Sequence, residues 1–211
     1  MTAIAAHRTK VLAILDDASN TKFSNNQVDQ AIRDALRDYS NAFPIERTYS
    51  FDCDGEDRIV LPADFVAMQV MRVELIPSGD SQDDLTKSNE IPFFANYSDE
   101  QWVIETPGRT IPIGRTIVIY YSGPHFIDGL DSAAGTTIPD TDDEIFALGA
   151  AGYALLSRGV NRSEANVIEG STVKDLQSLA QKYLHDFRGF LSGRDKGYIA
   201  AAWDLDSDDH F

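Results

Sequence analysis

The stretch from Ile138 to Val160, IPDTDDEIFALGAAGYALLSRGV, constrains the fold most, because it has the pattern of one buried helix with both ends marked. Thr141 and Glu144 have the spacing of a capping box, and Gly159 stands where a helix stop is expected. The run Gly149 to Gly152 contains two glycines, and each interior glycine costs about 1 kcal/mol relative to alanine. We therefore expect another helix or a strand to pack closely against this run, although an ordinary core helix is the alternative.

Four acidic side chains crowd the start of this helix: Asp140, Asp142, Asp143 and Glu144. Negative charge at a helix N-terminus complements the helix dipole, which explains the cluster without a further assumption. A second interpretation is a carboxylate-based hydrolase that uses Asp140 and Glu144 as paired acid and base. Alanine substitution with an activity screen would test it. We favour the dipole interpretation and expect no catalytic residues.

Other stretches also have helical spacing. Ser24 with Gln27, and Thr172 with Asp175, carry the spacing of helix starts. Pro44 ends the second helix, because the residue before a proline avoids helical angles. Together with the central helix, the expected helices are 3–17, 24–43, 141–158 and 172–192.

The segment between the second and third helices changes to a period of two. Tyr49 and Phe51 alternate with polar residues, and Asp54-Gly55 is a turn signal. The run TIVIYY at 116–121 is rich in β-branched and aromatic residues, which favour strands. These features predict an antiparallel β insertion over 47–122, with a polar loop over 77–89.

The combined pattern predicts an α+β fold. It is a helical bundle, made of an N-terminal hairpin and two C-terminal helices, with an inserted antiparallel β-sheet and an extended C-terminal tail. We expect a single domain over 1–193 and a docking tail over 194–211. Large apolar residues in this acidic tail either fold back on the domain or dock on another subunit, and we favour docking. The candidate partner-binding residues are Tyr198, Ile199, Trp203, Leu205 and Phe211.

Charge and composition argue against several classes of function and of binding site. Lys and Arg number 18 against 34 Asp and Glu, giving a net charge of −16, which argues against binding to phosphates or to anionic membranes. The single cysteine, Cys53, excludes an internal disulfide and a cysteine metal cage. The first residues lack the long apolar core expected of a signal peptide, and no run approaches membrane-spanning length. No phosphate-binding glycine loop occurs in the sequence, and the histidines are isolated. We therefore expect cytoplasmic synthesis and no cofactor or metal.

Two local patterns have a competing interpretation. Tyr97 and Trp102 could stack a sugar, which would make the chain a carbohydrate- or ligand-binding module of a virion or tail component. Aromatic residues on a small sheet are more often part of the core.

Asp204, Asp206 and Asp208 alternate like the ligands of a calcium loop. The position that requires glycine is an aspartate, so we favour a solvated acidic tail.

The order of these motifs resembles the head-to-tail connector (adaptor) proteins of tailed bacteriophages. The matching segments are Gln27 to Tyr39, Leu61-Pro62-Ala63-Asp64-Phe65, Ile138 to Leu156 and Thr172 to Leu184. The resemblance implies a structural virion protein with no enzymatic activity, which forms a homo-oligomeric ring of about twelve copies below the portal. It also implies contacts with the portal protein and with a tail or neck protein on the distal side. DNA would pass through the ring without specific binding, and the ring would sit in the virion neck after assembly in the host cytoplasm.

The uneven charge adds two expectations to this resemblance. Residues 1–50 are balanced, with six basic and six acidic groups, so the acidic excess lies in 51–211. We expect these acidic residues to line or rim the channel, where like charge repels phosphate. We also expect residues 194–211 to contact the portal or a neighbouring subunit.

Overall fold

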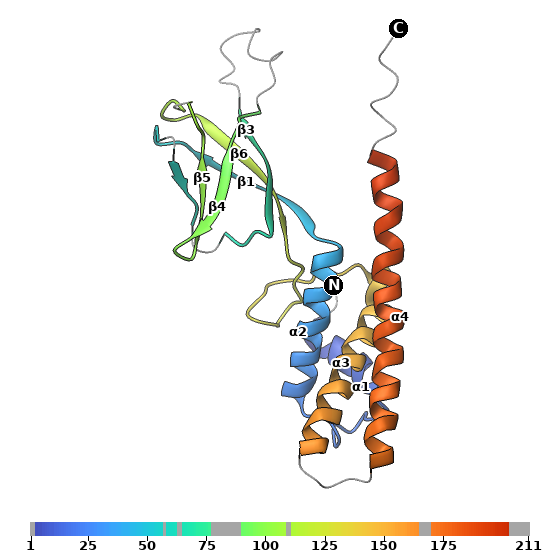
Figure 1. Ribbon diagram of the computed structural model, residues 1–211. Helices are drawn as coiled ribbons and strands as arrows, with labels where there is room; N and C mark the ends of the chain where they lie inside the picture. Colours follow the sequence, from blue (N-terminus) through green and yellow to red (C-terminus); the bar gives the residue numbers. More distant parts are fainter. Residues whose placement is uncertain are drawn as a thin grey trace. The chain divides into compact units, whose positions relative to one another are not determined.

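The computed structural model describes residues 3–56, 58–62, 65–76, 90–108, 111–164 and 170–202, without the side chains of 160–164, 170–173 and 194–202. The predicted α+β class is confirmed, because the chain combines helices with small antiparallel sheets (Figure 1). The chain divides into two compact units. A helical unit is built from residues 1–43 and 125–211, and a β unit is built from 44–124.

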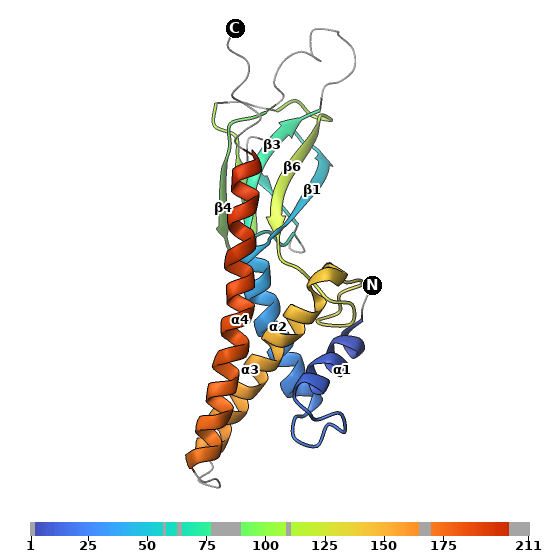
Figure 2. The same cartoon turned by 90° about the vertical axis from the view of Figure 1, so that its right-hand side faces the viewer.

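The helical unit is organised around α3, which packs against every other α-helix of the unit. Figures 1 and 2 show α3 between α2 and α4, with α1 crossing on another side. The elements of this unit are α1 (Ile4–Ile14), α2 (Asn25–Ala42), the short 3-10 turn η1 (Asp140–Asp142), α3 (Asp143–Glu164) and α4 (Gly170–Ala202). The core beneath them is apolar and includes the fully buried Val28, Ile32, Phe146 and Phe187.

The two proposed capping boxes have different outcomes. At α2 the box is confirmed: Ser24 Oγ accepts a hydrogen bond from Gln27 N at 3.3 Å, and Gln27 Oε1 accepts one from Ser24 N at 2.9 Å. The box predicted at Thr141 is wrong. Thr141 lies inside η1, and its hydroxyl donates to Asp142 Oδ1 at 3.0 Å instead of accepting from a free N–H of α3.

Two of the expected helices run further than the sequence indicated. Gly159 was predicted to stop α3, and this is wrong, because α3 continues to Glu164. An ideal Cβ at Gly159 would lie 3.5 Å from Gln177 Cγ, so packing against α4 continues past this glycine. Helix α4 ends at Ala202 rather than at 192, so the first part of the expected tail is helical. Residues 203–211 lie outside the described residues.

In the part of the β unit that the structure describes, the strands form two three-stranded antiparallel sheets rather than one. The first has the strand order β1-β6-β3 and the second has β2-β5-β4. The strands are β1 (Ile45–Asp52), β2 (Arg58–Val60), β3 (Gln69–Leu75), β4 (Phe94–Ser98), β5 (Gln101–Glu105) and β6 (Thr116–Gly123). Their shared core includes the fully buried Ile104, Ile117 and Ile119, together with the thiol of Cys53.

Two sequence motifs of the β unit fall partly or wholly outside the description. Of the motif from Leu61 to Phe65, the structure describes Leu61, Pro62 and Phe65, and both Leu61 and Phe65 are buried. The predicted loop over 77–89 lies outside the described residues.

Candidate interaction surface

The antiparallel pairing of α3 and α4 determines where α4 leaves the bundle. Gly149 lies against Phe187 and Gly152 against Leu184, so three steps forward along α3 correspond to three steps back along α4. By this register, the first residue of α3, Asp143, is level with position 193 of α4. Helix α4 then continues for nine residues, 194–202, which at 1.5 Å per residue is about 13 Å. We call residues 194–202 the projecting end of α4.

The predicted partner-binding residues divide between this end and the undescribed segment. Tyr198 and Ile199 belong to the projecting end, as positions of the helical backbone. Trp203, Leu205 and Phe211 lie outside the described residues. The structure therefore places two of the five predicted positions on a helix that continues past its antiparallel partner.

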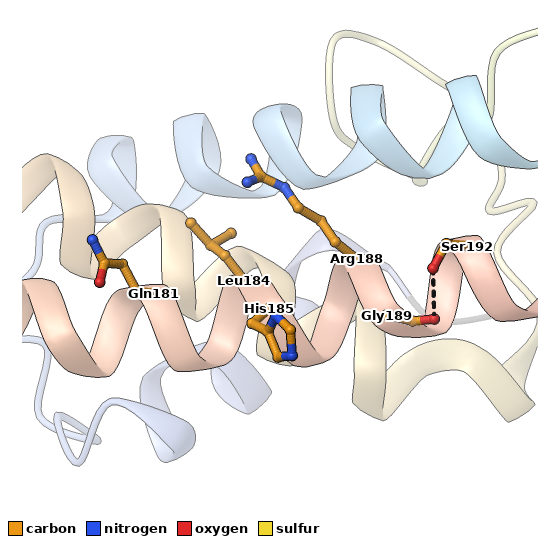
Figure 3. Close-up of a pocket in the computed structure, with 6 residues that line it drawn as sticks. All are labelled: Gln181, Leu184, His185, Arg188, Gly189 and Ser192. Carbon is orange, nitrogen blue, oxygen red and sulfur yellow. Dashed lines mark hydrogen bonds between the residues drawn. The ribbon is translucent and has the colours of Figure 1, made fainter.

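A groove runs along one face of α4, further back in the helix, and has a volume of about 530 Å³ (Figure 3). Its lining residues recur every three or four positions, which places them on one side of the helix. They are Gln181, Leu184, His185, Arg188, Gly189 and Ser192. Leu184 is buried, whereas Gly189 opens the groove, because an ideal Cβ there would meet no atom within 4 Å.

Arg188 anchors one edge of the groove to the rest of the bundle. Figure 3 shows its side chain extending from α4 toward α2. Arg188 Nη2 donates to the hydroxyl of Tyr153 on α3 at 3.4 Å, and that hydroxyl donates to Asp38 on α2. Burial, and then the bond to Asp38, raise the pKa of Tyr153, while the bond to Tyr153 raises the pKa of Arg188. Three helices are thus joined at this edge.

The acidic cluster at the start of α3 separates into buried and exposed members. Asp142 accepts from the hydroxyl of Tyr39 at 2.5 Å, and Asp143 lies 3.0 Å from Nδ1 of His7. Lys10 also donates to Asp143. The two buried carboxylates therefore join α1 and α2 to the start of α3. Sequence reasoning missed these partners, since Tyr39 and Asp142 are 103 residues apart.

The carboxylates considered for a hydrolase are the exposed members of this cluster. Asp140 belongs to η1, and Glu144 lies in the first turn of α3 beside its positive end. Their placement suits interaction with the helix dipole. Within the ranges that the structure describes, no group of three or more His, Cys, Asp or Glu side chains could hold a metal ion.

The two aromatic residues considered for sugar stacking do lie together. Tyr97 on β4 and Trp102 on β5 face each other across the hairpin, with ring centroids 5.7 Å apart and an interplanar angle of 62°. Tyr97 is 63% exposed, whereas Trp102 is half-buried against the core of the β unit. The rings are crossed and do not form one flat platform.

No protein-family model matches this sequence, and no curated protein matches it. Among the described helices, none is both long enough and apolar enough to cross a membrane.

Proposed function

We propose that this chain is a head-to-tail connector (adaptor) subunit of a tailed bacteriophage. In this role it is a structural virion protein of the neck that catalyses no reaction. Copies of it form a ring below the portal and join the capsid to the tail around the DNA channel. The observation that carries the proposal is the projecting end of α4, which continues about 13 Å beyond the start of its partner helix α3.

A helix that continues past its own bundle suits a subunit that must reach a neighbour. A closed ring needs two different surfaces on each subunit, which meet head to tail. Helix α4 offers both, because the projecting end lies at one end of the helix and the groove lies on its side. The order of helical hairpin, β unit and two final helices also agrees with the resemblance described above.

The net charge of −16 supports the second part of the proposal, passage of DNA without binding. Acidic side chains repel phosphate, so a channel bordered by them would not retain the duplex. Asp140, Glu144 and Asp186 are exposed acidic residues of the helical unit and are candidates for this border. Changing all three to lysine should slow DNA ejection from assembled particles, and an unchanged ejection rate would contradict this part of the proposal.

The decisive experiment is the native mass of the full chain, alone and mixed with portal-bearing heads. We expect a ring of about twelve copies, or co-sedimentation of the chain with the heads. Deleting residues 194–211 should leave thermal unfolding of the remaining chain unchanged and abolish attachment to the heads. A monomer that ignores the portal at every concentration would reject the proposal.

A further inference from the structure

We propose that the groove on α4 binds residues 203–211 of a second copy of this chain. The inference rests on the proposed self-assembly and identifies one of its contacts. The groove consists of Gln181, Leu184, His185, Arg188, Gly189 and Ser192.

The shape of the groove suits side chains that arrive from outside the subunit. Its volume of about 530 Å³ lies within the range of roughly 300–1,000 Å³ that is usual for binding pockets. Leu184 supplies a buried apolar surface, and Gly189 leaves open space where any other residue would place a Cβ. Figure 3 shows the lining side chains directed away from the axis of α4, with Gly189 and Ser192 at one end.

The chemistry of the groove complements the segment 203–211, whose sequence is WDLDSDDHF. Arg188 is exposed and has five N–H donors, one of which bonds the hydroxyl of Tyr153. A guanidinium forms strong charge-assisted hydrogen bonds with carboxylates and also stacks on aromatic rings. The segment offers both kinds of group, since it contains four aspartates together with Trp203, Leu205 and Phe211.

Chain length argues that the segment comes from another copy. Gln181 lies about 32 Å along the helix from the last residue of α4, Ala202. A segment that turned back would use at least two residues in the turn, and the remaining seven span about 23 Å when fully extended. In its own chain the segment could reach Ser192 and Arg188, which lies about 21 Å along the helix from Ala202, but it would stop short of Gln181 and Leu184. Only a segment from another copy could therefore occupy the groove along its whole length. A segment from a second copy has no such limit.

Disulfide cross-linking of the full chain tests the proposal. One preparation carries Ser192→Cys at the groove and a second carries Ser207→Cys in the segment. Under mild oxidation, an equal mixture should give a covalent dimer of the two variants. A chain carrying both substitutions should give a ladder of covalent oligomers. The wild-type chain is the control and should give no cross-link, because its single thiol, Cys53, is buried.

A matched pair of glycine substitutions tests the groove itself. Gly189→Leu fills the groove, whereas Gly193→Leu adds the same side chain one turn further along, at a position that does not line it. Neither position has an atom within 4 Å of an ideal Cβ, so both variants should fold and should melt at or slightly above the wild-type temperature, because leucine favours helices more than glycine does. In the Ser192→Cys and Ser207→Cys mixture, Gly189→Leu should reduce the cross-link at least tenfold, and Gly193→Leu should leave it within twofold.

The outcomes separate this inference from the proposed function. Cross-links that form only within single copies of the double-cysteine chain would overturn the inference. Equal yields of cross-link with Gly189→Leu and with Gly193→Leu would overturn it as well. A ring of native mass with no cross-link at all would also overturn it, while leaving the proposed connector role intact. A chain that stays monomeric and ignores the portal would overturn both.

Discussion

A Cβ atom built on Gly149 of α3 would lie 2.6 Å from Cγ of Phe187 on α4. The ring of Phe187 is fully buried and lies directly against the backbone of α3. The glycine therefore allows the two helices to approach this closely, which accounts for its place in a helix interior. The same contact sets the register that carries α4 past the start of α3.

Gly149→Ala should destabilise the protein even though alanine favours helices. The added methyl group must displace the base of the Phe187 ring, and overpacking of this kind costs about 1–3 kcal/mol. Gly189→Ala is the matched control, because its Cβ would meet no atom within 4 Å. That control should gain about 0.5–1 kcal/mol from helix propensity. Urea unfolding followed by circular dichroism measures both, and equal shifts in the same direction would contradict the packing argument.

Asp143→Ala should be among the most damaging single substitutions in the helical unit. Asp143 is buried and lies against His7 and Lys10 of α1, so its loss leaves basic groups without this carboxylate. Taking the acceptor away from the buried imidazole of His7 costs about 1–3 kcal/mol, and loss of the ion pair with the partly exposed Lys10 adds at most about 1 kcal/mol. Glu144→Ala, the exposed neighbour, should change the unfolding free energy by at most about 1 kcal/mol through the helix dipole. Similar urea midpoints for the two variants would contradict the assigned role of Asp143.

Asp17 should make the stability of the helical unit depend on pH in the acid range. Burial alone would raise the pKa of its carboxyl, but hydrogen bonds from the backbone of Phe23, Lys22 and Thr21 and from the Thr21 hydroxyl outweigh burial and lower the pKa from 3.8 to about 2. Because the folded pKa is lowered, this stabilisation is complete above the ordinary value of 3.8 and is lost as the pH falls toward 2.

The comparison with Asp17→Asn isolates this contribution from other titrating groups. The wild type should have the higher melting temperature at pH 5, because the neutral amide is a weaker acceptor than the carboxylate. The difference should shrink steadily between pH 4 and pH 2. A constant difference across this range would show that ionisation of Asp17 does not stabilise the fold.

The features that the sequence predicted correctly depend on neighbouring residues. The box of Ser24 and Gln27 spans three positions, and both partners are visible in one short stretch. The glycine run in α3 correctly indicated a close helix contact, but only the structure shows that Phe187 makes it.

The missed features depend on distant residues. The pairing of His7 with Asp143 joins α1 to α3 across most of the chain, and no local pattern reveals it. The division of the strands into two sheets was missed for the same reason, because β1 pairs with β6 and not with the next strand. The length of α4 was underestimated because Gly189 and Gly193 weaken a helix locally. In the structure, Phe187 and Leu191 are buried in the core of the helical unit and hold this part of α4 in place.

The turn between β4 and β5 offers a gain in stability that the natural sequence does not use. Asp99 and Glu100 have φ angles of 51° and 64°, so both central residues occupy the left-handed region that a two-residue type I′ hairpin turn requires. Asn-Gly is the preferred pair for such a turn, and a non-glycine residue at the second position is strained. Replacing Asp99-Glu100 with Asn-Gly should therefore raise the unfolding free energy by about 0.5–1 kcal/mol.

A control must show that any gain in unfolding free energy comes from the left-handed turn conformation and not from removal of a side chain. Gln101→Gly, at the first residue of β5, is the matched control. It should give no gain or a small loss of stability, since a strand position gains nothing from glycine and the unfolded chain becomes more flexible. Tryptophan fluorescence of both variants, measured in a Trp203→Phe background, follows unfolding of the β unit, because the remaining Trp102 is half-buried next to the turn. If the Asn-Gly variant unfolds at the same or a lower urea concentration than the wild type, the left-handed turn does not limit the stability of this hairpin.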